Sequence, residues 1–291
     1  MRFKEQKFAF TVLVILFLAN VLAWLAVIDL ENNSFLEVSF FDVGQGDAIF
    51  IETPKGHQIL IDGGPSSAIL EKLAKETPFW DRTIDLIILT HPEKDHLSGL
   101  IEVLKRYKVE NIIWTGIIRD IPEYKEWSML LQKEGAKIFL AKAGQKIKCS
   151  KGEPGNCYIE IFYPFEPLNG KEFKNSNSTS IVAKLVFGEN SFLFTGDAEK
   201  DVEKELIIKK LPIDSDILKI AHHGSKTSSS DDFVNLVSPQ IAVISAGKGN
   251  SYGHPHQEVL DVLAKYGIKI LRTNLQGDIK IFSDGKNLKI K

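Results

Sequence analysis

Hydrophobic and polar positions divide the chain into an apolar N-terminal stretch and a long segment in which strand and helix patterns alternate. The 21 residues from Phe8 to Ile28 include no charged side chain. A helix of that length, rising about 1.5 Å per residue, covers the roughly 30 Å hydrocarbon core of a bilayer. From residue 35 onward, short apolar runs between glycine-containing turns predict strands, and apolar residues at helical spacing predict helices. The sequence therefore predicts a transmembrane helix followed by a mixed α/β domain.

Charged residues around the apolar stretch predict its orientation. Basic residues precede it and acidic residues follow it, namely Arg2, Lys4 and Lys7 before it and Asp29 and Glu31 after it. The positive-inside rule then places the N-terminus in the cytoplasm and the globular part outside, as a single-pass protein of the cell membrane. The alternative is a cleaved signal peptide, because Val21-Leu-Ala23 resembles a small-residue cleavage site.

The same patterns predict three parts along the chain. Residues 1–30 form a basic tip and an anchor helix, residues 31–34 a polar linker, and residues 35–291 the globular domain. The predicted strands are 35–43, 48–52, 58–61, 86–89, 112–114, 180–187, 191–194, 217–220, 241–245, 268–272 and 279–283. The predicted helices are 68–76, one that includes 97–104, 124–133, 199–209 and 257–266.

Cysteine usage and net charge narrow the class of protein. The only two cysteines, Cys149 and Cys157, flank a turn-rich segment between strand-like runs. They can close a hairpin disulfide in an oxidising compartment, and two unpaired thiols are the alternative. The formal net charge is −2. The molecule as a whole therefore does not attract polyanions, and any nucleic acid has to be bound by local contacts.

The strongest chemical signal is the turn Leu89-Thr-His-Pro-Glu-Lys-Asp-His96. It brings together His91, Glu93, Asp95 and His96 after an apolar run. Imidazoles and carboxylates at this density suit one or two divalent ions such as Zn²⁺ or Mn²⁺. Further candidate ligands follow two later strand-like runs, at Asp197 and at the His222–His223 pair. Three such fragments at strand ends predict a metal centre, because rigid strands hold the side chains that follow them.

These motifs resemble the metallo-β-lactamase superfamily, whose signature is a His-x-His-x-Asp-His turn with later single ligands. Further motifs resemble the C-terminal hydrolase domain of ComEC-like competence proteins, which take up DNA. These motifs are Phe41-Asp-Val-Gly-Gln-Gly-Asp-Ala48, Leu60-Ile-Asp-Gly-Gly64, Asn177-Ser-Thr-Ser180, Phe194-Thr-Gly-Asp197, His222-His-Gly-Ser225 and Tyr252-Gly-His-Pro255. The resemblance implies a four-layer αββα sandwich over residues 35–291. The multi-helix channel region of those proteins is not found in this chain.

The resemblance also implies the ligand sets. His91 and Glu93 would face a first metal, Asp95 and His96 a second, and Asp197 would bridge the two. His223 would complete the second site with His222 beside it, although His222 is the alternative ligand.

Two departures from the family pattern affect the first site. Glu93 stands where many members have His, and Asn177 lies in a segment where the superfamily expects another His. The first site should therefore bind its ion more weakly and favour Mn²⁺.

The resemblance assigns further roles around the ions. A bound ion lowers the pKa of water toward about 7, and Asp95 would orient that water. Developing charge on the substrate would be met by Lys226, His254 and the backbone amide of Ser225. Other residues are expected to brace the ligand turn rather than bind metal, namely Asp42, Asp47 and Asp62.

The predicted function is a membrane-anchored, extracytoplasmic metal-dependent phosphodiesterase that acts on DNA in uptake or scavenging, with a separate channel protein as a possible partner. Two alternatives remain open, because one fold supports many substrates. One is a lactonase or β-lactamase acting on small molecules. The other is a metal-stabilised module that binds DNA or a channel without cutting.

Overall fold

The computed structural model describes residues 2–31, 35–149 and 156–291. Of the predicted linker at 31–34, Glu31 belongs to the N-terminal helix and residues 32–34 lie outside the described residues, as does the turn at 150–155 between the cysteines. The chain divides into two compact units, Met1–Ser34 and Phe35–Lys291.

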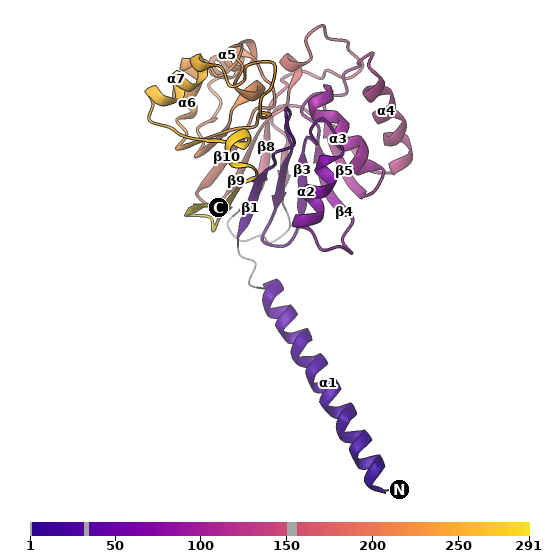
Figure 1. Cartoon of the computed structure of the whole chain (residues 1–291). Helices are drawn as coiled ribbons and strands as arrows, with labels where there is room; N and C mark the ends of the chain where they lie inside the picture. Colours follow the sequence, from indigo (N-terminus) through magenta and orange to yellow (C-terminus); the bar gives the residue numbers. More distant parts are fainter. Residues whose placement is uncertain (1, 32–34, 150–155) are drawn as a thin grey trace. The chain divides into compact units, whose positions relative to one another are not determined.

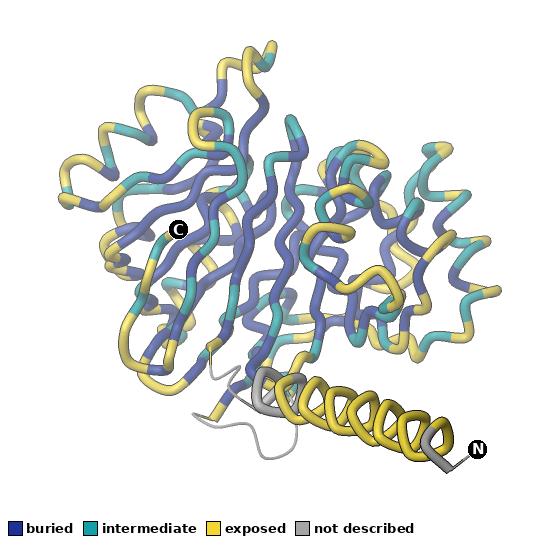
Figure 2. Tube along the Cα trace, turned by 60° about the horizontal axis from the view of Figure 1, so that its bottom comes forward, coloured by how far each residue is buried: buried dark blue, intermediate teal, exposed yellow. Residues whose placement is uncertain are grey.

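The first unit is one long helix, α1 (Arg2–Glu31). Its stretch Lys4–Leu25 is long and apolar enough to cross a membrane, and none of it is buried against protein. In Figure 2 the residues of this helix whose burial is described are coloured as exposed. A signal sequence near the N-terminus can meet the same criteria of length and hydropathy, so both interpretations of the sequence stay open.

The second unit contains two sheets. The first has the strand order β15-β14-β1-β2-β3-β4-β5-β6. Its strands are β1 (Leu36–Phe40), β2 (Ile49–Glu52), β3 (Gln58–Ile61), β4 (Thr83–Ile88), β5 (Lys108–Trp114), β6 (Lys137–Leu140), β14 (Ile279–Ser283) and β15 (Leu288–Ile290). Strands β1 to β3 form an antiparallel meander. Strands β3 to β6 are parallel, and Ile61 is aligned with Ile88.

The second sheet has the strand order β13-β12-β11-β10-β9-β8-β7. Its strands are β7 (Lys146–Lys148), β8 (Tyr158–Tyr163), β9 (Val182–Phe187), β10 (Asn190–Phe194), β11 (Ile217–Lys219), β12 (Ile241–Ile244) and β13 (Lys269–Arg272). Strands β9 and β10 form a hairpin, and β10 to β13 are parallel. Parallel strands end at one edge of a sheet, so the residues that follow β10, β11 and β12 gather there.

The sheets pack face to face and helices cover both outer faces, as Figure 1 shows. The helices are α2 (Ala68–Glu76), α3 (Lys94–Leu104) and α4 (Pro122–Glu134) on the first sheet, and α5 (Lys200–Ile208), α6 (Asp231–Val237) and α7 (Gln257–Lys265) on the second. Three short helical segments complete the chain: η1 (Asn177–Thr179), η2 (Ala221–Gly224) and α8 (Thr273–Gln276). The predicted αββα sandwich is confirmed.

Side-chain alternation along the strands explains this layering. Phe40 and Ile51 point into the core between the sheets, whereas the neighbouring Phe41 and Phe50 belong to the core under α2 and α3. Strands buried on both faces carry near-continuous apolar runs. Figure 2 shows the resulting buried centre.

Several details differ from the sequence prediction, and strands β6 and β15 were not among the predicted strands. The first strand ends at Phe40 instead of Val43, because the chain leaves the sheet to approach the ligand turn, where the Asp47 N–H donates to the Asp95 carbonyl at 3.3 Å. Helix α6 was not predicted. It is too short to show a clear helical period in sequence.

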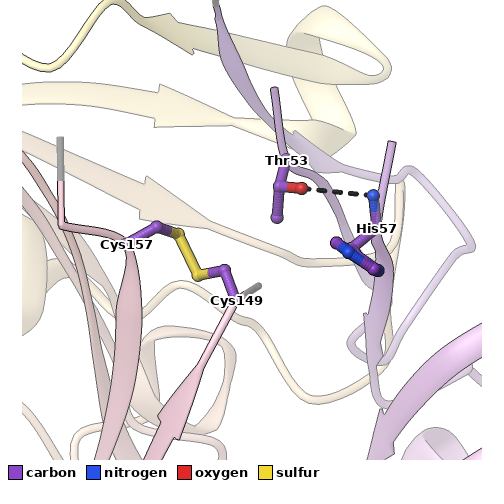
Figure 3. Close-up of a disulfide and its surroundings, with 4 residues drawn as sticks. All are labelled: Thr53, His57, Cys149 and Cys157. Carbon is purple, nitrogen blue, oxygen red and sulfur yellow. Dashed lines mark hydrogen bonds between the residues drawn. A yellow bond between two sulfur atoms is a disulfide. The ribbon is translucent and has the colours of Figure 1, made fainter. Parts of the chain in front are cut away.

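A disulfide joins Cys149 to Cys157, as predicted (Figure 3). Cys149 directly follows β7 and Cys157 directly precedes β8. At this end of the hairpin, Lys148 pairs with Tyr158. The bond therefore closes the end of this hairpin at the edge of the second sheet.

Candidate metal centre

Four parallel strand ends deliver the candidate ligands to one edge of the sandwich. In the first sheet, Asp62 follows β3 and His91 follows β4. In the second sheet, Asp197 follows β10 and the His222–His223 pair follows β11. Because the strands in each pair run in the same direction, residues far apart in sequence meet at this edge.

The centre of the site is formed by Asp95, His96, Asp197 and His223. Their ligand atoms all lie within 4.8 Å of one another. His96 Nε2 is 3.4 Å from Asp197 Oδ1, and His223 Nε2 is 3.2 Å from Asp95 Oδ2. His96, His223 and Asp197 are buried, whereas the Asp95 side chain is 33% exposed. The cluster is therefore open on the side of Asp95.

Unsatisfied polar atoms indicate that this cluster suits a metal ion. Within the described part of the chain, His91 Nε2, His96 Nε2 and Asp197 Oδ1 are buried without a hydrogen-bond partner. Buried polar atoms nearly always have partners, and their absence at one point calls for an explanation. A divalent cation bound by imidazole nitrogens and carboxylate oxygens supplies it, since these are ligands of Zn²⁺ and Mn²⁺.

His91 lies beside this cluster. Its Nε2 is 4.0 Å from Asp197 Oδ2, and its ring centroid is 4.3 Å from that of His96. Burial, together with the neighbouring His96, lowers the pKa of His91 to about 3. The imidazole is thus neutral at physiological pH, which is the form that binds metals.

Mutual electrostatics keep the carboxylates ionised. Burial alone raises the pKa of Asp197, but His223 and His96 outweigh it and hold that pKa well below its usual value. Burial alone lowers the pKa of His223, but Asp197 and Asp47 outweigh it and raise that pKa to about 10. Carboxylates that stay charged at this depth are suited to a cation.

Asp62 orients two of the imidazoles. Its Oδ2 lies 2.8 Å from His96 Nδ1 and accepts a hydrogen bond from the Thr90 hydroxyl at 2.7 Å. Thr90 Oγ1 in turn lies 3.1 Å from His91 Nδ1. Both rings therefore direct Nε2 toward Asp197, an arrangement in which a carboxylate sets the ring that binds a metal.

A buried ion pair supports the other side of the cluster. Lys219, the last residue of β11, places its ammonium group against Asp47 Oδ2, and both side chains are almost fully buried. Asp47 Oδ1 also lies 3.4 Å from His223 Nδ1, which is 2.9 Å from the Ser245 carbonyl oxygen. Lys219 and Asp47 thus fix the imidazole of His223 on its Nδ1 side, opposite the Nε2 atom that faces Asp95.

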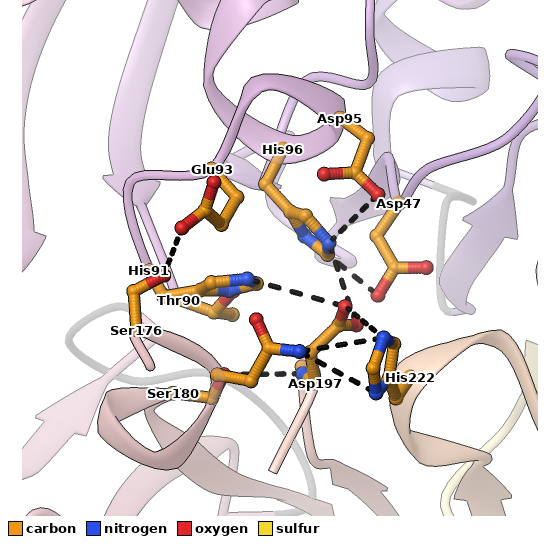
Figure 4. A network of polar contacts seen from close by, with 12 residues as sticks. Asp47, Thr90, His91, Glu93, Asp95, His96, Ser176, Ser180, Asp197 and His222 are labelled. Atoms are coloured by element: carbon orange, nitrogen blue, oxygen red, sulfur yellow. Dashed lines mark hydrogen bonds and ion pairs between the residues drawn. The ribbon is translucent and has the colours of Figure 1, made fainter. Parts of the chain in front are cut away.

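The residues expected at the first metal are arranged differently. Figure 4 shows the imidazoles of His91, His96 and His222 directed toward Asp197, whereas the Glu93 carboxylate is directed toward Ser176. Glu93 Oε1 accepts hydrogen bonds from Ser176 and from the Arg119 guanidinium. Among the described residues, Glu93 therefore lies outside the group whose ligand atoms converge.

His222 and Asn177 lie at the edge of the site. Nε2 of His222 is 3.9 Å from Asp197 Oδ2, and the Asn177 side-chain nitrogen is 3.3 Å from the same Nε2. His222 and His223 have φ values of 48° and 55°, a left-handed conformation that is costly for such residues. This conformation directs both rings of consecutive residues toward Asp197.

Three other predicted site residues, Lys226, His254 and Ser225, differ in exposure and in their contacts. The Lys226 side chain is exposed, and its backbone N–H donates to His256 Nδ1 at 3.1 Å. The ring of His254 lies 5.5 Å from His222 and 6.3 Å from His223, and burial and these neighbours lower its pKa to about 4. Ser225 is buried with its hydroxyl 3.1 Å from the Thr227 hydroxyl.

Asp42 lies in the loop before Asp47 and is directed to the backbone rather than to the cluster. Its Oδ1 accepts the Gly44 N–H at 3.3 Å. Further along that loop, Gly46 packs so closely on the ligand turn that a Cβ there would come within 2.2 Å of the Asp95 carbonyl oxygen. The loop therefore braces the turn through its backbone.

Sequence reasoning missed Lys219, Thr90 and the pair of Arg119 and Ser176. The signal for Lys219 was its position within an apolar run that predicts a buried strand. A buried lysine almost always has a charged partner, so this position indicated an ion pair. The contacts of Arg119 and Ser176 join segments far apart in sequence. Local patterns do not reveal such contacts.

A family model matches this architecture and site. Residues 41–248 match the metallo-beta-lactamase superfamily, and this match covers more than half of the chain. The protein therefore belongs to the metallo-β-lactamase superfamily.

Curated relatives place it near proteins named for competence. It is 31% identical over 261 residues to "ComE operon protein 3" of Bacillus subtilis, which covers 84% of this chain and 32% of the relative. It is also 31% identical over 253 residues to "Competence protein ComA" of Neisseria gonorrhoeae, covering 86% of this chain and 32% of the relative. The chain spans about a third of the length of these relatives.

Solved structures agree on the fold. Igni18, a metallo hydrolase of Ignicoccus hospitalis, aligns with a TM-score of 0.53 at 17% identity and covers 84% of this chain and 98% of its own. CmlA, a diiron beta-hydroxylase of Streptomyces venezuelae, aligns with a TM-score of 0.54 at 14% identity, covering 85% and 54%. Family and metal cluster together identify a metal-dependent hydrolase related to competence proteins.

Proposed function

We propose that this protein is a membrane-anchored metal-dependent phosphodiesterase that cleaves DNA outside the cytoplasm, in uptake or scavenging. The observation that carries the proposal is the buried His and Asp cluster in a chain similar to competence proteins along most of its length. The apolar helix α1 supports the anchor, and the basic residues before it support an extracytoplasmic domain.

The proposed ligands follow the geometry of the site. Asp95, His96 and His223 would hold one Zn²⁺ or Mn²⁺ ion with Asp197, which also faces His91. Glu93 would join His91 at a second ion only after leaving Arg119 and Ser176, while His222 is the alternative imidazole beside Asp197. The bound metal supplies an activated water at neutral pH and polarises a phosphoryl oxygen.

The protein's own residues would position the substrate. Asp95, the most exposed member of the cluster, would orient the attacking water from the open side. The neutral ring of His254, which lies 5.5 Å from that of His222, and the exposed Lys226 would contact a phosphodiester or its leaving group. We also propose a separate channel protein as a partner, since the chain is similar to competence proteins along most of its own length.

The decisive experiment is cleavage of end-labelled single- and double-stranded DNA by the full chain in detergent, after metal removal and addition of Mn²⁺ or Zn²⁺. The variants are Asp197→Ala and, as a matched control, Asp201→Ala, which changes an exposed aspartate on the adjacent helix α5. We expect metal-dependent cutting by the parent and the control and its loss in Asp197→Ala. Cutting that persists in Asp197→Ala would contradict the proposal.

A second candidate is a metal-stabilised module that binds DNA or a channel without cutting. The contacts of Glu93 with Arg119 and Ser176 favour it, because they leave His91 without Glu93 as a second ligand for an ion. This candidate predicts bound metal and DNA affinity with no product under either ion. Hydrolysis of a lactone or β-lactam without DNA cleavage would instead identify a small-molecule hydrolase.

A further inference from the structure

Two adjacent aromatic side chains project from the second unit, Phe35–Lys291, far from the metal centre. We call this unit the catalytic unit. Phe79 is 80% exposed and Trp80 is 73% exposed, in the loop between α2 and β4. Their rings pack edge to face with centroids 4.8 Å apart. Large aromatic residues at this exposure are a marker of an interaction surface when they cluster.

The loop that carries them is held in place by hydrogen bonds. The Asp81 N–H donates to the Pro78 carbonyl at 2.9 Å, which closes a turn around the two aromatic residues. The Asp81 carboxylate accepts the Gln58 side-chain amide at 2.7 Å and the Thr83 N–H at 3.1 Å. The aromatic pair is therefore presented by an ordered turn.

Strand directions locate this turn within the unit. Strand β1 is antiparallel to β2, β2 is antiparallel to β3, and β3 is parallel to β4. Strands β1, β3 and β4 thus run in the same direction, as can be followed in Figure 1. They end at the edge of the sandwich where the candidate ligands lie, which we call the metal edge. The aromatic turn precedes β4, so it lies at the edge opposite the metal centre.

The same edge receives the chain from the N-terminal unit. Strand β1 begins at Leu36, five residues after the end of α1 at Glu31. Phe35, immediately before β1, is itself 48% exposed. Five residues reach at most about 17 Å when fully extended, so α1 in a bilayer would keep this edge close to the lipid surface.

Two acidic groups near this turn have polar partners. Glu76, at the end of α2, forms an ion pair with Lys280, and Asp81 is bonded to Gln58 and Thr83 as described above. Their partners reduce the cost of bringing this edge to a lipid headgroup layer. Tryptophan and phenylalanine suit such a layer, since their rings are apolar and tryptophan also carries a hydrogen-bond donor.

We propose that Phe79 and Trp80 insert into the interface of the bilayer that holds α1 and so orient the catalytic unit on the membrane. This inference rests on the membrane anchor of the proposed function but is independent of the substrate. It places the metal edge on the side of the unit that faces away from the lipid. A long polymer could then reach the metal centre without meeting the bilayer.

Tryptophan fluorescence of the full chain in phosphatidylcholine nanodiscs tests this inference. Trp24 lies in α1, whereas Trp114 and Trp127 are buried in the core. The parent for the test is therefore Trp24→Phe, and its matched control also carries Trp80→Phe. We expect brominated lipid to quench part of the emission of Trp24→Phe and expect that quenchable part to disappear in the double variant.

A third variant separates this inference from the anchor. In Trp80→Phe alone, quenching of Trp24 reports whether α1 is in the bilayer. Quenched Trp24 with unquenched Trp80 would overturn the docking of the aromatic turn and leave the anchor intact. Unquenched Trp24 would overturn both. The DNA cleavage assay in detergent decides the hydrolase activity separately.

Discussion

At the scale of single residues, the buried Lys219–Asp47 pair is the most consequential feature that the ligand motifs do not contain. A buried ion pair contributes little net stability, but a charge left alone in the interior is strongly destabilising. Asp47 also faces His223, so the pair links the stability of the core to the geometry of the metal centre.

Replacing this lysine should therefore be costly. Lys219→Met keeps the chain length of the side chain but leaves Asp47 with only partial compensation. We expect the free energy of unfolding to fall by about 3 kcal/mol, measured by urea denaturation of the metal-free protein. The double variant Asp47→Asn with Lys219→Met should recover part of the loss. Equal instability of the single and double variants would show that charge is not the cause.

Glu93 gives a second prediction at this scale. Its carboxylate contacts Arg119 and Ser176 and is absent from the converging group of Asp95, His96, Asp197 and His223. Glu93→Gln should therefore retain at least one ion per chain, whereas His96→Ala should lose most of its metal. Elemental analysis after dialysis measures both. Complete loss of metal in Glu93→Gln would show that Glu93 moves to bind the ion.

At the scale of elements, the helix that follows the ligand turn contributes to the site. Asp95 and His96 lie in the first turn of α3, where the helix dipole favours negative charge. The pKa of Asp95 is lowered, since His96 and His223 outweigh its burial. The element that supplies these ligands thus also helps to keep the carboxylate ionised.

The disulfide gives a testable prediction at the scale of elements. Cys149 and Cys157 close a short loop at the end of the β7–β8 hairpin, and the chain-entropy model gives about 2.5 kcal/mol for a loop of this size. Reduction should lower the free energy of unfolding by about that amount, measured by denaturation with and without dithiothreitol. The control is Cys149→Ser with Cys157→Ser, which should be insensitive to the reductant. Equal stability in all samples would contradict the prediction.

At the scale of the whole molecule, metal binding should stabilise the catalytic unit. The candidate ligands lie in segments that follow strands of both sheets: His96 lies in α3 after β4 of the first sheet, and Asp197 and His223 follow β10 and β11 of the second. An ion held by them joins the two halves of the sandwich. An ion that binds only the folded state at 100 times its dissociation constant adds about 2.7 kcal/mol.

The corresponding measurement is thermal unfolding before and after chelation. We expect chelation to lower the Tm by about 5–10 °C for a unit of this size. Asp197→Ala should have a Tm that responds little to added metal, and Asp201→Ala should respond like the parent. A parent Tm that is unchanged by chelation would contradict a tightly bound ion in this cluster.

Much of the molecule was predictable from local sequence. The apolar stretch from Phe8 to Ile28, the ligand turn from His91 to His96 and the hairpin of β9 and β10 each carry their signal within a few residues. Strand and helix periods reflect which side chains must be buried, and this requirement acts on neighbouring residues. Local patterns therefore determined the mixed α/β class, the hairpin cysteines and the residue types at the metal edge, and the family resemblance added the four-layer sandwich.

Only the tertiary structure decided which of these residues meet. It directed Glu93 to Arg119 and Ser176, placed Lys219 behind His223, and put Phe79 and Trp80 at the edge opposite the metal centre. These contacts join segments that are separated by many residues, and their formation depends on strand order and on the direction of packed side chains. Such information belongs to the packed chain as a whole, and no local pattern contains it.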